Sequence, residues 1–288
     1  MRFVLAPHES AGEGLKRVIR EQADKLAAEC SEAQEHPSAF AHKARVRCKR
    51  IRATLRLARP LMRDRVFVRE NRWWRDLARL LSGVRDASAR LEALETLRPL
   101  LSARIGTEAA RRLEERLRAE RSETDTAGAI SAFIGRLEAR GGDLVPDLEP
   151  GGRDKLVMAL AETYRIARRA MKVAMETDDA DSLHEWRKQA KYHALQVRLM
   201  RQQFPDALDR RVAGVRDLAE LLGEVQDIEI LREAAHGWKQ RPAGFYEVLK
   251  TRRVALVTGA RASGAALFAD KPLAWCKGLR PPVLAGQD

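Results

Sequence analysis

The chain has 288 residues, of which 54 are basic and 41 acidic, so its formal net charge is +13. An apolar content of 45% excludes a fully disordered chain, and the charged residues, 33% of the total and spread throughout, exclude a protein with several membrane spans. The three cysteines form no Cys-x-x-Cys pair. They favour neither a disulfide framework nor a zinc knuckle, and they predict a reducing, cytoplasmic location.

Apolar residues recur three and four positions apart along nearly the whole chain, as over residues 77–84 and 218–225, which is typical of amphipathic helices. Runs of alternating β-branched residues are absent. The sequence therefore predicts an all-α fold. Breaks are expected at or near Pro37, Pro60, Pro99, Pro205 and Pro242. The predicted helical segments are residues 10–36, 38–59, 66–98, 107–139, 153–177, 180–203, 206–239, 242–262 and 264–277.

An internal repeat divides the chain into two halves. Residues 75–86 align with residues 216–227 at an offset of 141, with eight of twelve positions identical. The Gly- and Pro-rich residues 141–152 lie between the halves. We therefore predict an internal duplication, with a first helical bundle over 1–140, a linker over 141–152 and a second bundle over 153–288. Each half holds about four main helices, the number of a four-helix bundle.

Basic residues form a matching stripe in each half. At an offset of 142, His42, Arg45, Lys49, Arg56 and Arg59 align with His184, Arg187, Lys191, Arg198 and Arg201. On a helix, each set falls within an arc of about 100°. Arg52 extends the first stripe and Lys188 the second, while Ala194 replaces the counterpart of Arg52. Like charges this close repel one another, so the stripes predict an anionic partner.

That partner could be internal or a ligand. The repeat segments contain Asp76, Asp86, Asp217 and Asp227, which could pair with the stripes in a structural salt-bridge network. Further cations favour a ligand, because the acids cannot neutralise them all: Arg75, Arg79, Arg165 and Arg169. Arginine suits phosphate, since its planar guanidinium donates two parallel hydrogen bonds. A neutral histidine in each stripe could donate to a phosphate oxygen or, alternatively, cap a buried carbonyl.

Residues 42–52 and 183–192 resemble the two signatures of the CHAD family, the conserved histidine α-helical domain. Residues 10–21 fit as well, as do the two repeat segments, which end at residues 86 and 227. The resemblance covers nearly the whole chain. It implies two pseudo-symmetric helical bundles around a basic cavity or pore. It also implies binding of inorganic polyphosphate and association with polyphosphate granules. The family's basic positions fall on His42, Arg45, Lys49, Arg50, Arg52, His184, Arg187, Lys188 and Lys191. The second signature departs from the family at Ala194, which follows His193, and Arg198 lies one turn later.

No catalytic motif accompanies these stripes. The sequence lacks a Glu-x-Glu-x-Lys strand, a Walker loop and a His-Glu-x-x-His motif. The acidic residues at 178–181 are predicted to cap a helix and not to bind metal. We therefore predict a binding module that is not an enzyme and has no cofactor, metal site or membrane partner. The alternatives are an RNA- or DNA-binding protein and a helical scaffold.

The predicted polyphosphate-binding residues combine both stripes with their neighbouring cations. They are His42, Arg45, Lys49, Arg50, Arg52, Arg56, Arg75, Arg79, Arg165, Arg169, His184, Arg187, Lys188, Lys191 and Arg198.

Overall fold

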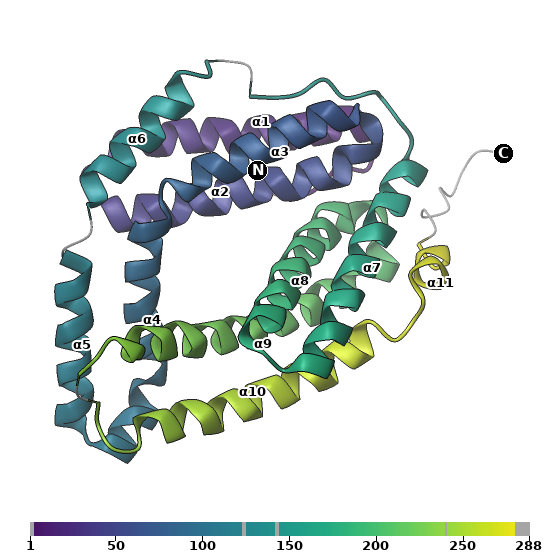
Figure 1. Cartoon of the computed structure of the whole chain (residues 1–288). Helices are drawn as coiled ribbons and strands as arrows, with labels where there is room; N and C mark the ends of the chain where they lie inside the picture. The colour runs from purple at the N-terminus through teal and green to yellow at the C-terminus, as the bar shows by residue number, and fades with distance from the viewer. Residues whose placement is uncertain (1–2, 123–124, 142–143, 240, 280–288) are drawn as a thin grey trace.

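The computed structural model confirms an all-α fold and describes residues 3–122, 125–141, 144–239 and 241–279 (Figure 1). Within these ranges there is no strand, and no helix is long and apolar enough to cross a membrane. The helices are α1 (Ala11–Glu29), α2 (Pro37–Ala58), α3 (Asp64–Arg79), α4 (Ser82–Ile105), α5 (Thr107–Ser122), α6 (Thr126–Glu138), α7 (Arg153–Thr177), α8 (Ala180–Met200), α9 (Pro205–His236), α10 (Phe245–Leu267) and α11 (Pro272–Lys277). Short 3-10 turns follow α1, α2 and α8.

Local sequence signals set where several helices begin. Ser10 and Asp179 cap α1 and α8, because each side chain accepts a hydrogen bond from the backbone amide three residues later, at 3.3 and 2.7 Å. Pro37 and Pro205 are the first residues of α2 and α9. A proline at the first helical position leaves no intrahelical bond unmade, since that amide has no partner in any helix.

One predicted helix, residues 66–98, is two helices in the structure. α3 ends at Arg79 and α4 begins at Ser82, whose hydroxyl donates a 2.7 Å hydrogen bond to the Arg79 carbonyl. The intervening turn consists of Leu80 and Leu81, and Leu81 is fully buried. Because the turn contains neither glycine nor proline, the apolar spacing continues through it and the sequence pattern does not reveal the break.

Three other predicted boundaries were wrong. The break predicted between residues 262 and 264 lies inside α10. Pro99 lies inside α4, where its nitrogen has no hydrogen to donate to the Glu95 carbonyl; both residues are exposed, so water can satisfy that carbonyl. The single helix predicted over residues 107–139 is instead α5 and α6. Asp125 begins α6 by accepting a 2.8 Å hydrogen bond from the amide of Gly128, a start signal that the apolar periodicity obscured.

The buried hydrophobic side chains of the described residues form three clusters. The first joins α1, α2, α3 and α6 around Phe40, Trp74 and Phe133. The second joins α4 and α5 to α7–α10 and contains Trp186, and the third joins residues near the N-terminus and the end of α2 to α7, α8 and α11. The last two clusters therefore contain residues from both sides of residues 141–152, of which 142–143 lie outside the described residues. The division into 1–140 and 153–288 and the internal duplication stay predictions from the sequence.

Helices α2, α4, α9 and α8 form a closed ring of contacts (Figure 1). α2 contacts α4 and α8, and both α4 and α8 contact α9. The two helices that carry the basic stripes, α2 and α8, therefore lie next to α4 and α9. The last residues of the two repeat segments lie on those neighbours, Asp86 on α4 and Asp227 on α9.

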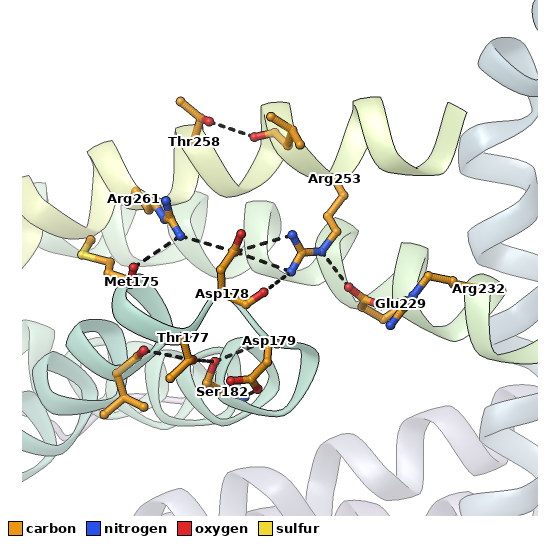
Figure 2. Close-up of polar contacts among 12 residues, drawn as sticks. Met175, Thr177, Asp178, Asp179, Ser182, Glu229, Arg232, Arg253, Thr258 and Arg261 are labelled. Carbon is orange, nitrogen blue, oxygen red and sulfur yellow. Dashed lines mark hydrogen bonds and ion pairs between the residues drawn. The ribbon is translucent and has the colours of Figure 1, made fainter. Parts of the chain in front are cut away.

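A network of charges fixes the connection between α7 and α8 (Figure 2). Asp178 ends α7 in the left-handed conformation, with φ of 51°, and its carbonyl accepts a 2.7 Å hydrogen bond from Arg253 of α10. Its carboxylate lies 3.5 Å from Arg253 and 3.3 Å from Arg261. Arg253 also donates to Glu229 of α9 at 2.8 Å. The next residue, Asp179, caps α8, so this network lies directly beside the start of that helix.

Candidate functional site

The two basic stripes meet where α2 approaches α8. Lys49 of α2 lies within electrostatic range of Arg45, one turn earlier on the same helix, and of Arg187 and Lys191 on α8. These side chains have at least partial access to solvent, whereas the intervening Cys48 is fully buried. The helical spacing predicted from the sequence thus separates a basic face from a core face on α2.

A fifth cation comes from α4. Arg85 lies within electrostatic range of Arg45, Lys49, Arg187 and Lys191. We call Arg45, Lys49, Arg85, Arg187 and Lys191 the central basic cluster. Arg85 was not among the binding residues predicted from the sequence. The signal was available, because Arg85 stands next to Asp86 at the end of the repeat segment, but its counterpart in the second half is the neutral Gln226.

Carboxylates neutralise the central basic cluster only in part. Asp86 lies near Arg45 and Asp227 near Arg187, so the ends of the two repeat segments occupy equivalent positions beside the two stripes. Burial raises the pKa of Asp227, although Arg187, Arg85 and Lys191 oppose this rise. Glu92 pairs with Arg85 at 3.0 Å. Five cations therefore face three carboxylates.

The crowding lowers the pKa of both lysines. Lys49 keeps contact with solvent but has protein on most sides, and this loss of hydration, followed by the charges of Lys191 and Arg187, lowers its pKa to about 7. Burial and Arg187 lower the pKa of Lys191 to about 8, against the opposing effect of Asp227. An anion placed among these groups would favour their charged forms and raise both pKa values.

A second basic group lies along α2 beside Tyr192 of α8. The guanidinium carbons of Arg56 and Arg52 lie 4.3 and 5.7 Å from the centre of the Tyr192 ring. Arg52 also donates to Asn71 of α3 at 3.1 Å, and Arg75 lies within electrostatic range of it. We call Arg52, Arg56 and Arg75 the tyrosine-side group.

Three guanidinium groups at these sites bear buried donors without a hydrogen-bond partner among the described residues. The donors are Nε of Arg56, Nη1 of Arg85 and Nε of Arg187. They come from α2, α4 and α8 respectively. A buried, unpartnered donor on a charged group carries a desolvation cost, which an acceptor-rich anion hydrogen-bonded to these donors would offset.

The two histidines occupy related positions. Nδ1 of His184 lies 2.6 Å from Oε1 of Gln226, a hydrogen bond in which the imidazole donates. His42 lines a pocket of about 480 Å³ together with Arg85, the counterpart of Gln226 in the repeat. Three glutamates also line this pocket, which makes its charge mixed: Glu92, Glu95 and Glu114. The basic cavity or pore implied by the resemblance stays a prediction.

Comparison with known proteins places these features in a family. The family model of the CHAD domain matches residues 17–236 of the sequence. The chain belongs to the CHAD domain family. This CHAD domain superposes on the CHAD domain from the plant Ricinus communis with a TM-score of 0.63 and 18% identity, covering 98% of this chain and 97% of that one. PptA from Streptomyces chartreusis superposes with a TM-score of 0.57 and 16% identity, covering 90% of this chain and 99% of that one. Both likenesses show a shared fold. No curated protein matched the sequence.

Several predicted residues of this CHAD domain lie apart from the central basic cluster. Arg50 points toward α1, where it donates to Gln22 at 3.3 Å and stacks over Phe3, and Arg198 is its neighbour. Arg165 pairs with Glu162 at 2.6 Å.

Three further predicted residues are exposed. Lys188 pairs with Glu185, Arg79 lies 3.8 Å from Asp76, and Arg169 lies on α7. These residues lie on the same helices or in the same family signatures as the central basic cluster, but they are not part of it. Among the described residues, no group of three or more His, Cys, Asp or Glu side chains is placed to hold a metal ion.

The departure at Ala194 has a structural counterpart. His193 is fully buried, and its ring packs near Tyr164, Phe268 and Trp275. Burial, and then the charge of Arg211, lower the pKa of His193 well below its ordinary value. His193 is therefore a core residue and does not replace the missing cation, so the basic surface beyond Lys191 belongs mainly to α2.

Proposed function

We propose that this CHAD domain binds inorganic polyphosphate along the central basic cluster and the tyrosine-side group. The observation that carries the proposal is the set of three buried guanidinium donors without partners, on Arg56, Arg85 and Arg187. A linear chain of phosphates supplies closely spaced negative oxygens, and each guanidinium can donate two parallel bonds to such a group.

Electrostatics supports the same conclusion. Loss of hydration lowers the pKa values of Arg45, Lys49 and Lys191, and repulsion from neighbouring cations lowers them further. A polyanion would replace that repulsion by attraction in a partly desolvated environment, where charges interact more strongly than in water. The gain is greatest for a ligand that contacts cations from α2, α4 and α8 at once.

The aromatic side chains favour polyphosphate over nucleic acid. Single-stranded nucleic acids are bound largely by stacking of bases on exposed aromatic rings. Tyr192 and Trp186 are buried, and Trp74 packs in the first hydrophobic cluster. Because these rings are buried, they cannot stack on nucleobases. A ligand held by the basic groups would be bound through its phosphates, and it would need no nucleobase. RNA or DNA binding is the second candidate, and a helical scaffold stabilised by salt bridges the third.

The proposal assigns binding and no catalytic step. A domain that holds long phosphate chains would accumulate where those chains collect. We therefore include association with polyphosphate granules in the proposal, on the support of family membership.

Calorimetric titration with polyphosphate of defined length, at fixed salt, tests the proposal. The double variant Arg45→Glu/Arg187→Glu should lower affinity at least about 100-fold, because it reverses two charges that would contact phosphate. The matched variant Arg112→Glu/Arg210→Glu changes net charge equally at exposed positions on α5 and α9 and should retain affinity. Circular dichroism and thermal unfolding would establish that all three proteins are folded.

Competition separates the candidates. Polyphosphate should displace RNA of equal charge; if RNA wins, the nucleic-acid alternative replaces the proposal. If the native protein binds neither, and the double variant is more stable than the native protein, the helical scaffold is supported. Salt dependence alone does not discriminate, because both polyanions release counterions on binding.

A further inference from the structure

One half-buried arginine of the tyrosine-side group has an aromatic ring as its partner in place of a carboxylate. The side chain of Arg56 forms no ion pair and no hydrogen bond with any of the described residues. Its guanidinium carbon lies 4.3 Å from the centre of the Tyr192 ring, within the range of a cation–π interaction. Arg165, by contrast, pairs with Glu162 at 2.6 Å. The orientation of Arg56 therefore depends on Tyr192.

The same ring attracts a second arginine, one helical turn earlier on α2. The guanidinium carbon of Arg52 lies 5.7 Å from the centre of the Tyr192 ring, and its Nε donates to Asn71 at 3.1 Å. Like charges one turn apart on a helix repel each other. Among the described residues, no carboxylate pairs with Arg52 or Arg56, so attraction to the face of one tyrosine offsets part of this repulsion.

The Tyr192 ring has a fixed position between α8 and α2. The residue is 5% exposed. One turn later on α8, the buried Gln196 donates a 3.0 Å hydrogen bond to the Ala53 carbonyl of α2. A guanidinium group that lies over a fixed ring loses less conformational freedom when it binds a ligand than one that is free to move.

We propose that Tyr192 is a positioning residue of the polyphosphate site, whose ring holds Arg56, and more weakly Arg52, in an orientation suited to phosphate. This inference rests on the proposed binding of polyphosphate. Stacking uses the flat face of a guanidinium group and leaves the N–H donors in its plane available. The Nε of Arg56 is enclosed, whereas its two terminal nitrogens are not. These terminal nitrogens are the donors that would bond to phosphate oxygens.

Calorimetry on the full chain, with polyphosphate of defined length at fixed salt, tests this role. Tyr192→Phe keeps the ring and should bind within about twofold of the native protein, whereas Tyr192→Leu removes it and should bind about fivefold more weakly. Tyr246→Leu is the matched control and should leave affinity unchanged. Tyr246 also has an arginine over its ring, Arg241 at 5.5 Å, but it lies on α10, outside both basic groups.

A double-mutant cycle separates positioning from a general structural effect. In an Arg56→Gln background, Tyr192→Leu should weaken binding by less than about twofold, because the ring then acts only on the more distant Arg52. Arg56→Lys keeps the charge but lacks a planar group that can stack, and it should bind about threefold more weakly than the native protein. This variant leaves the buried ring in place, so it tests the inference even if Tyr192→Leu does not fold.

NMR gives a readout that does not depend on affinity. The Nε–Hε signal of Arg56, identified by its loss in Arg56→Gln, should be shifted upfield by the ring in the native protein and in Tyr192→Phe. The shift should be lost in Tyr192→Leu. A tyrosine that only fills space beside α2 would leave this signal at an ordinary position.

The outcomes distinguish the inference from the proposed function. Where the native protein binds polyphosphate, the inference is overturned by unchanged affinity of folded Tyr192→Leu or of Arg56→Lys. It is also overturned by equal losses in Tyr192→Phe and Tyr192→Leu, or by a loss in Tyr192→Leu that is the same with and without Arg56. Each of these results leaves the proposed function standing. Failure of the folded native protein to bind polyphosphate overturns the proposed function and this inference with it.

Discussion

The side-chain amide of Gln196 donates a 3.0 Å hydrogen bond to the backbone carbonyl of Ala53, which joins α8 to α2 inside the protein. Gln196 is fully buried. One turn earlier on α8, Tyr192 lies beside Arg52 and Arg56 of α2. A single buried polar contact therefore helps to set the separation of the two helices that carry the basic stripes.

Replacing Gln196 by glutamate should destabilise the protein more than replacing it by methionine. Methionine removes the hydrogen bond but preserves the volume, which costs about 1 kcal/mol. Glutamate places a carboxylate beside the Ala53 carbonyl in a fully buried site, and we expect a loss of about 3 kcal/mol at pH 7. Urea denaturation gives the free energies of unfolding. Equal free energies of unfolding for the two variants would contradict this prediction, because they would show that the site accepts a carboxylate as well as an apolar side chain.

Arg56→Gln should weaken polyphosphate binding about tenfold, because it removes a guanidinium whose Nε is buried and unpartnered. Arg165→Gln removes the same charge from an exposed residue that already pairs with Glu162, and its affinity should change less than about twofold. Calorimetry at fixed salt measures both. A larger effect at Arg165 would place the ligand along α7 instead of α2.

Polyphosphate binding should take up protons above neutral pH. The pKa values of Lys49 and Lys191 are lowered to about 7 and about 8 in the free protein, and a bound anion raises them. The complex then carries more protons than the free protein, so affinity should fall as the pH rises from 7 to 9.

Calorimetry at pH 8 in HEPES and Tris buffers, which differ in ionisation enthalpy, measures this uptake. We expect about 0.5 to 1.5 protons per ligand bound. Lys49→Arg should reduce the uptake more than Lys191→Arg, since arginine stays charged and Lys49 is the more fully deprotonated residue. Uptake that both variants leave unchanged would assign the protons to other groups.

The network around Asp178 gives a stability prediction (Figure 2). Arg253 is 19% exposed, and Arg253→Met would remove its bonds to Glu229 and Asp178, with an expected cost of about 2 kcal/mol. The neighbouring Arg252 pairs with the more exposed Glu224, and Arg252→Met should change stability by less than about 0.5 kcal/mol. Urea denaturation would compare the two. Similar costs would mean that the α7–α8 connection is not held by this network.

The sequence alone was sufficient to predict the all-α class and the basic faces of α2 and α8. Apolar residues at spacings of three and four define one buried side of each helix, and that spacing simultaneously places Arg45 with Lys49, and Arg187 with Lys191, on the opposite side. The turn at residues 80–81 could not be predicted, because its leucines continue the apolar pattern while tertiary packing, and not a breaker residue, ends the helix.

Which cations share one site was decided by tertiary structure. Arg50 and Lys49 are adjacent in sequence, yet a rotation of about 100° along α2 directs Arg50 toward α1 and Lys49 toward α8. Arg85 lies 36 positions after Lys49 and joins the cluster only because α4 returns to contact α2. Helical periodicity is a local property that sequence determines residue by residue, whereas electrostatic neighbours on different helices depend on how buried surfaces such as those around Trp186 and Gln196 pack together.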